Sequence, residues 1–281
     1  MIELDEFEIR RSRETEPALI IRGEAHIPAD PRGTVVICHG FKGFAHWAFF
    51  PYLAARLAAG GLRAITFDFS GSGIGDDREN FTNPDAFTAN TYRQELDDVE
   101  AVLAKARDSG WMEDGYGLFG HSRGGGVAVI RASIDKNVKA LVTWAAISST
   151  NRWTTEATAE WRRSGFTNIH NARTGQTIPL SVALLDEVEM YGESTLNVAA
   201  AASRIDMPWL IIHGSADETV AVSEGERLHQ ASKGSSTLRV IDGANHAFDA
   251  RHPLTETPPA LTTATSETVA FFAEHLQKPG M

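Results

Sequence analysis

The feature that most constrains this chain is a serine flanked by glycines, in the sequence Gly120-His121-Ser122-Arg123-Gly124. Residues 115–120 are apolar in the manner of a buried strand, and residues 124–134 have the pattern of a helix. A serine at such a strand-to-helix turn sits on a sharp, strained corner that exposes its hydroxyl. Glycine is needed on both sides because side chains there would collide with the turn. We therefore predict that Ser122 is a nucleophile, the alternative being a glycine-rich turn that contains a serine by chance.

A base and an acid follow the serine along the chain. A serine hydroxyl needs a base to remove its proton, and the base needs a group that orients it. The apolar segment 207–213 runs into a glycine turn that ends in Asp217, and the apolar segment 236–241 runs into a turn that ends in His246. We predict that His246 is the general base and then the general acid, and that Asp217 holds the required imidazole tautomer.

Other residues compete for these roles. Asp217 would alternatively cap the helix that follows it, and Asp242 and Asp249 are alternative acids. Asp242 lies too close to its strand end, and Asp249 comes after the histidine, so Asp217 is favoured. Arg123 pairs either with an acidic substrate or, more simply, with a nearby carboxylate. Three histidines adjoin predicted strand ends, where a structural role is the simpler interpretation: His39, His121 and His213.

The chain resembles the α/β-hydrolase superfamily, and within it the small capped serine esterases and lipases and related serine peptidases. The resemblance covers nearly the whole chain and rests on five motifs in the family's order: Val35-Val36-Ile37-Cys38-His39-Gly40-Phe41-Lys42-Gly43, Phe67-Asp68-Phe69-Ser70-Gly71-Ser72-Gly73, Gly120-His121-Ser122-Arg123-Gly124-Gly125, His213-Gly214-Ser215-Ala216-Asp217 and Gly243-Ala244-Asn245-His246. It implies a hydrolase that works through a covalent acyl-enzyme. It also implies an oxyanion hole made by the backbone N–H groups of Phe41 and Arg123.

Composition narrows the class of protein further. The 281 residues include 26 basic and 37 acidic ones, and the net charge of −11 argues against nucleic acid as a partner. No apolar run approaches the ~20 residues that span a membrane, and the acidic start does not resemble a signal peptide. The single cysteine, Cys38, cannot form an internal disulfide, which fits a reducing compartment. We expect a cytoplasmic protein that acts on a small-molecule ester.

No cofactor or metal ion is expected. The sequence has no H-E-x-x-H motif and no paired C-x-x-C spacing. Gly71-Ser72-Gly73-Ile74-Gly75 is placed like a dinucleotide-binding loop, but Asp76 stands where that fingerprint needs glycine or alanine. We interpret this segment as a loop that binds no nucleotide.

The order of the predicted elements indicates an α/β fold. Residues 2–11 and 17–25 alternate in polarity like an antiparallel pair of strands. Six later segments have the continuous apolar character of strands covered on both faces: 34–39, 62–69, 115–120, 138–146, 207–213 and 236–241. Five segments have helical patterns: 47–59, 87–108, 124–134, 222–231 and 261–276. We predict the α/β-hydrolase fold, with a mostly parallel eight-stranded sheet and helices on both faces.

Residues 148–203 break this alternation. A plain crossover needs roughly a dozen residues, so we predict a helical cap inserted after the sixth strand. The core is then formed by residues 1–147 and 204–281. By the resemblance, the apolar side of a cap lines the substrate pocket; the alternative is a helical excursion packed for stability.

Within the insertion, two helices are expected. Trp153 and Trp161 are spaced to share one helix face, and residues 180–190 suggest a second helix. Residues 165–175 are predicted to be a polar turn, in which His170 either meets substrate or, more simply, is solvated.

These features together favour a serine esterase that cleaves small to medium acyl or aryl esters. A serine aminopeptidase or acylaminoacyl peptidase would need an acidic group to hold the substrate ammonium, and the insertion offers five: Glu156, Glu160, Asp186, Glu187 and Glu189. A non-catalytic ligand-binding protein on the same fold would be expected to lack one of the three catalytic residues, and none is missing.

Overall fold

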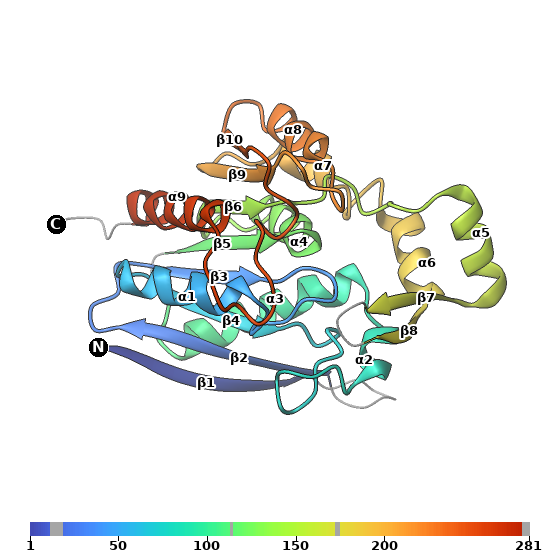
Figure 1. The fold of residues 1–281 in the computed structure, drawn as a ribbon, viewed down its shortest axis with the longest axis horizontal. Coiled ribbons are helices and arrows are strands. Elements are labelled where there is room, and N and C mark those ends of the chain that lie inside the picture. The colour runs from blue at the N-terminus through green and yellow to red at the C-terminus, as the bar shows by residue number, and fades with distance from the viewer. Residues whose placement is uncertain (12–18, 113–114, 172–174, 277–281) are drawn as a thin grey trace.

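The computed structural model describes residues 1–11, 19–112, 115–171 and 175–276. Its main sheet has eight strands in the order β1-β2-β4-β3-β5-β6-β9-β10 (Figure 1). In chain order they are β1 (Ile2–Arg11), β2 (Leu19–Pro28), β3 (Thr34–Cys38), β4 (Arg63–Asp68), β5 (Tyr116–His121), β6 (Val138–Trp144), β9 (Trp209–Gly214) and β10 (Ser236–Ile241). β2 pairs antiparallel with β1 and β4, and the other pairs are parallel. The predicted mostly parallel sheet is confirmed, although β2 continues to Pro28 and positions 17 and 18 lie outside the described residues.

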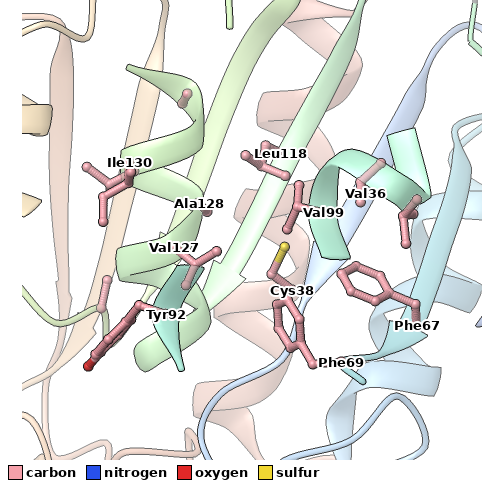
Figure 2. Packing of buried hydrophobic residues seen from close by; sticks show 14 of the residues in the cluster. Val36, Cys38, Phe67, Phe69, Tyr92, Val99, Leu118, Val127, Ala128 and Ile130 are labelled. Atoms are coloured by element: carbon pink, nitrogen blue, oxygen red, sulfur yellow. The ribbon is translucent and has the colours of Figure 1, made fainter. Parts of the chain in front are cut away.

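Alternation along the central strands produces two cores. Along β3, Val35 and Ile37 belong to one core, whereas Val36 and Cys38 belong to the other. Figure 2 shows the second core, where Cys38 and Val36 pack with side chains from β4, β5, α3 and α4. Since both faces are covered, every residue of β3 and β5 is buried.

Helices cover the sheet on both faces, as predicted. Those of the first core are α1 (Phe49–Ala59) and α9 (Pro259–His275), and those of the second include α3 (Tyr92–Asp108), α4 (Arg123–Ala132) and α8 (Val222–Ala231). Within the described part of the chain, no helix is both long and apolar enough to cross a membrane.

The helix predicted over residues 87–108 is two helices, α2 (Pro84–Thr88) and α3. The side chain of Thr91 starts α3 by accepting a hydrogen bond from the backbone N–H of Gln94 at 3.3 Å. Threonine followed three residues later by glutamine is the sequence of a capping box. The apolar spacing of the segment continues across this point and therefore suggests a single helix. Asn90, between the two helices, and Glu95, in the first turn of α3, are both buried.

Between β6 and β9 the chain leaves the main sheet and extends to one side of it (Figure 1). Its elements there are α5 (Thr155–Ser164), β7 (Phe166–Asn171), β8 (Gln176–Ser181) and α6 (Val182–Tyr191), after which α7 (Val198–Ala202) returns to the core and packs against α4 and α8. β7 and β8 pair antiparallel as a separate two-stranded sheet, so the insertion contains a hairpin besides the predicted helices. The polar turn predicted at 165–175 is largely strand β7, and its residues 172–174 lie outside the described residues.

The two tryptophans of the insertion are in contact, but they do not share a helix. Trp153 precedes α5, and its ring packs edge-on against that of Trp161 with 5.0 Å between centroids. Trp161 is buried and donates its Nε1–H to the C=O of Leu180 at 3.0 Å. Leu180 lies in β8 rather than in the predicted second helix, so this bond ties α5 to the hairpin.

Replacing Thr91 by alanine should lower the free energy of unfolding by about 1 kcal/mol, because the N–H of Gln94 loses its acceptor. Thr91→Ser keeps the hydroxyl and should retain most of that stability. Urea unfolding followed by circular dichroism measures both variants. Equal stability of the alanine and serine variants would contradict the capping role.

Candidate active site

Ser122 occupies a strained turn between β5 and α4. Its backbone angles are φ 57° and ψ −121°, which residues other than glycine rarely adopt. Such a conformation costs roughly 1–3 kcal/mol and persists only where the surroundings enforce it. Here the Ser122 N–H donates to the C=O of Trp144 at 2.9 Å, and the Ser122 C=O accepts from the N–H of Gly125 at 3.0 Å. The turn is thereby fixed to the end of β6.

The glycines around Ser122 allow main chain to approach main chain. A Cβ atom on Gly120 would lie 2.3 Å from the C=O oxygen of Gly124, and one on Gly124 would lie 2.2 Å from that of His39. A Cβ atom on Gly125 would lie 2.5 Å from the Cβ of Ala146. The turn therefore packs directly against the end of β3 and the segment after β6, which gives the glycines the steric reason expected from the sequence.

The segment after β3 brings the backbone N–H of Phe41 close to the nucleophile turn, which itself carries the N–H of Arg123. A Cβ atom on Gly40 would lie 3.0 Å from the Cβ of Ser122, so the loop that holds Phe41 adjoins the nucleophile turn. Over the residues that the structure describes, neither the N–H of Phe41 nor that of Arg123 donates to an acceptor within the protein. Backbone N–H groups with this freedom are what binding of an oxyanion requires.

His246 and Asp217 are brought together from the loops after β10 and β9. His246 Nδ1 donates to Asp217 Oδ2 at 2.7 Å, and Asp217 Oδ1 accepts from the N–H groups of Thr219 and Val220 at 2.9 Å each. Burial by itself would raise the pKa of Asp217, but hydrogen bonds from His213, His246 and Val220 outweigh it and hold the pKa below its ordinary value. Asp217 is therefore ionised at neutral pH.

His121 connects the nucleophile turn to the loop that carries His246. Its Nε2–H donates to the C=O of His246 at 3.0 Å, and the two rings lie 4.7 Å apart between centroids. The His246 ring thus lies beside the residue that precedes Ser122. Within the described chain, the Ser122 hydroxyl forms no hydrogen bond, and such a bond to a base often tightens only in the substrate complex.

The competing acids lie in other surroundings. Asp242 is exposed and accepts a hydrogen bond from Ser215 Oγ at 3.0 Å. Asp249 is also exposed, and its carboxylate lies 3.4 Å from the N–H of Asn245. Helix α8 has no side-chain cap, so Asp217 does not serve as one. Of the three acids, only Asp217 contacts His246.

The histidines expected to be structural are buried and hydrogen-bonded. His39 Nε2 accepts from the N–H of Phe69 at 3.0 Å, and its Nδ1–H donates to the C=O of Gly40 at 2.9 Å, which defines a neutral tautomer. His213 Nε2–H donates to the C=O of Val220 at 2.8 Å. In the regions that the structure describes, no group of three or more histidine, cysteine or acidic side chains is arranged to hold a metal ion.

Arg123 forms a buried ion pair with Glu95, whose role the sequence does not indicate. Arg123 Nε donates to Glu95 Oε2 at 2.9 Å. The guanidinium also lies over the rings of Tyr92 and Phe41, at 4.0 and 5.2 Å from their centroids. A nearby carboxylate was the simpler expectation for Arg123, but nothing in the sequence singled out Glu95, which lies inside a long polar helix pattern.

The hairpin of the insertion contacts the core close to this site. Lys42, next to Phe41, donates from Nζ to the C=O of His170 at 3.4 Å. Thr88 Oγ1, at the end of α2, donates to the C=O of Pro179 at 2.8 Å. The His170 side chain is itself exposed. The hairpin is therefore joined to the loop after β3 and to α2.

Comparison with known proteins identifies two sequence families. Residues 29–181 match the family described as serine aminopeptidase, S33, and residues 176–276 match the dienelactone hydrolase family. One similar solved structure is a putative hydrolase from Agrobacterium vitis S4, which is 18% identical over 96% of this chain and 99% of that one, with a TM-score of 0.73. A second is Est1E from Butyrivibrio proteoclasticus with ferulic acid bound, which is 19% identical over 95% of this chain and 99% of that one, with a TM-score of 0.69. A third is the esterase domain of a Rhodothermus marinus protein, which is 16% identical over 98% of this chain and 99% of that one, with a TM-score of 0.67. At these identities the likeness shows the fold, and it confirms the α/β-hydrolase fold.

Two buried imidazoles predict a loss of stability in acid. Burial lowers the pKa of His39 to about 4, and burial together with the nearby His246 lowers that of His121 to about 3. Histidine in an unfolded chain has a pKa near 6.5, so below about pH 6.5 the unfolded state binds protons that the folded state does not. The free energy of unfolding should therefore decrease as the pH is lowered below about 6.5, by up to about 1.4 kcal/mol per pH unit for each group.

His39→Gln tests this linkage, because the glutamine oxygen can still accept from the N–H of Phe69 while one titrating group is lost. Between about pH 6 and pH 4.5, its free energy of unfolding should fall less steeply than that of the wild type. Urea titrations at several pH values measure the two slopes. Equal slopes in the two proteins would show that His39 does not contribute to the pH dependence of stability.

Proposed function

The chain belongs to the serine aminopeptidase S33 family of hydrolases, and within that family we propose that it cleaves carboxylic esters with small to medium acyl or aryl groups. The observation that carries the proposal is the 2.7 Å hydrogen bond from His246 to the buried Asp217, with the His246 ring held beside the strained turn at Ser122. An oriented imidazole next to a partly exposed serine is the arrangement that activates a hydroxyl for acyl transfer.

In the proposed reaction, His246 Nε2 takes the proton of Ser122 Oγ as this oxygen attacks the ester carbonyl carbon. The carbonyl oxygen becomes an oxyanion, which the N–H groups of Phe41 and Arg123 bind. Collapse of the intermediate breaks the bond to the alkoxy group, which takes the proton from His246 and leaves as an alcohol. Water repeats the cycle on the acyl-enzyme and releases the carboxylic acid, while Asp217 stabilises each imidazolium.

We further propose that residues 148–203 form a cap on a core of residues 1–147 and 204–281. Support comes from the hydrogen bond between Lys42 and the hairpin, which brings the insertion to the loop of the proposed oxyanion donor. The Phe41 ring is partly exposed and lies 5.1 Å from that of Phe87 in α2, beside β8. The partly exposed Phe41 ring, packed on the buried Phe87 ring, offers an aromatic surface to an acyl or aryl group. Ferulic acid, the compound bound in the Est1E structure, is an aryl acid of that kind.

Cleavage of peptides from a free amino end has less support. It would need an unpaired acid for the substrate ammonium, but Glu187 already accepts from the N–H groups of Tyr92 and Arg93 at 2.7 and 3.2 Å. Three further acids of the insertion form ion pairs with arginines of α5: Asp186 and Glu189 with Arg162, and Glu160 with Arg163. Only Glu156, exposed on the first turn of α5, remains of the five candidates. A substrate whose acyl part carries no ammonium group therefore fits the insertion better than one whose acyl part is cationic.

Ser122→Ala should reduce the turnover of 4-nitrophenyl esters by a factor on the order of 10⁶, towards the residual rate that an oxyanion hole and binding supply. The assay uses a series of esters of increasing acyl length beside aminoacyl 4-nitroanilides, with wild type and variant in parallel. Hydrolysis of esters without anilides supports the proposal. Faster hydrolysis of the anilides would replace it with the aminopeptidase reaction, and an active alanine variant would remove Ser122 from the mechanism.

Asp217→Asn should lower kcat for the best ester by about 10⁴-fold, because the amide no longer selects the productive tautomer of His246. Asp242→Asn is the matched control, since it makes the same change on an exposed acid nearby, and it should stay within about twofold of the wild type. Steady-state kinetics of purified proteins give both values. Equal losses in the two variants would contradict the role assigned to Asp217.

A further inference from the structure

Glu95 and Arg123 form a buried ion pair that the proposed bond-breaking steps do not use. Their side chains are 5% and 6% exposed, and Glu95 Oε1 also accepts a hydrogen bond from Asn90 Nδ2 at 3.0 Å. Removing two charges from water costs free energy that their attraction only partly returns, so a buried pair is weak support for stability. Its position, directly after the nucleophile, calls for another explanation.

The pair contacts both segments that carry the proposed oxyanion donors. Arg123 supplies one backbone N–H itself, and its guanidinium lies over the ring of Phe41, whose N–H is the other donor. The guanidinium also lies over the ring of Tyr92, at 4.0 Å. A planar guanidinium stacks on aromatic rings in a way that the compact ammonium of lysine does not. One side chain therefore links the start of α4 to the loop after β3.

A second ion pair shows that the two helices are joined without this one. Arg131, on α4, pairs with Glu100 on α3 at 2.5 Å, where the side chains are 15% and 49% exposed. Both residues lie more than one helical turn beyond Arg123 and Glu95 in the sequence. Because this partly exposed pair already connects α3 and α4, attachment of the helices does not account for a buried charge beside Ser122.

We propose that Glu95 is a positioning residue for the oxyanion hole. Its carboxylate fixes the Arg123 guanidinium, the guanidinium fixes the Phe41 ring, and the N–H groups of Phe41 and Arg123 are thereby held at one spacing. This inference rests on the proposed function, because the spacing matters where both groups bind one oxygen. Donors must lie about 2.7–3.1 Å from an oxyanion. A small shift of Phe41 therefore weakens binding of the transition state more than binding of the substrate.

The test is Glu95→Gln, which keeps the size of the side chain and removes its charge. Relative to wild type, kcat per active site should fall about 10- to 100-fold with KM changed less than about threefold, as for loss of part of an oxyanion interaction. Active sites are counted with a fluorophosphonate that labels Ser122, so that unfolded molecules do not enter the rate. Binding of a trifluoromethyl ketone, which forms a tetrahedral adduct with the serine, should weaken by the same factor as kcat/KM.

Amide hydrogen exchange gives a readout that does not depend on turnover. Peptides that cover residues 39–43 should exchange faster in Glu95→Gln than in wild type, whereas peptides from α9 should be unchanged. Glu100→Gln is the matched control, because it neutralises the other carboxylate between α3 and α4. It should leave kcat, ketone binding and exchange of residues 39–43 as in wild type.

Arg123→Lys is the second variant. It keeps a positive charge beside Glu95 but loses the planar contact with Phe41, so it should show the same fall in kcat and the same faster exchange. Wild-type kcat and wild-type exchange in either Glu95→Gln or Arg123→Lys would overturn the inference, as would equal losses in Glu100→Gln. If the wild type cleaves no ester, the proposed substrate is wrong, and labelling rate and amide exchange still decide the positioning role.

Discussion

The structure depends on direct contact between main chains at the turn that carries Ser122. Without a side chain at Gly124, the turn reaches the carbonyl groups at the end of β3, and without one at Gly120, the start of α4 packs directly on the end of β5. That approach places Phe41 and Arg123 on neighbouring segments, so two backbone donors adjoin one serine. The strained angles of Ser122 persist because β3 and β6 hold the turn from two sides.

Around this turn, burial and hydrogen-bond partners together decide the charge of each ionisable group. His39 has a donor on one nitrogen and an acceptor on the other, and burial keeps it neutral. Asp217 is buried as well, yet two imidazoles and two backbone N–H groups keep it ionised. Arg123 keeps its charge because Glu95 supplies the opposite one. Three buried groups around the turn thus carry three different charges, set by burial for His39 and by their partners for Asp217 and Arg123.

Most of the main sheet was predictable because the central strands are buried on both faces and read as continuous apolar runs. The spacing of apolar residues predicted helix ends and the short hairpin strands less well. The capping threonine Thr91 divides a segment whose apolar spacing alone suggests one helix. The hairpin strand Phe166–Asn171 is polar enough to resemble a turn, because one side of it faces solvent. In both places a local hydrogen bond or strand pairing overrides the spacing of apolar residues.

The candidate site shows the same division. Ser122, Asp217 and His246 could be proposed from the sequence, since each follows an apolar strand and strand ends of a parallel sheet share one edge. The structure brings Asp217 to His246, while the contact of His246 with the Ser122 hydroxyl stays a prediction. Glu95 could not be found in this way, because the sequence of a helix does not distinguish a buried glutamate from an exposed one. Its partner Arg123 is also 28 positions away.

The hairpin β7–β8 is attached to the core through its own carbonyl groups, at His170 and Pro179. Because every amino acid carries that acceptor, these two bonds place no demand on side chains, whereas Ile178 and Leu180 of β8 are buried in the core and have to remain apolar. Mutations at the exposed positions of the hairpin can therefore accumulate without releasing it from Lys42 and Thr88. A surface held by main-chain hydrogen bonds can change its exposed side chains without losing its place, which suits the evolution of new substrate preferences. Its exposed positions are therefore a natural place to randomise residues when the specificity of this chain is engineered.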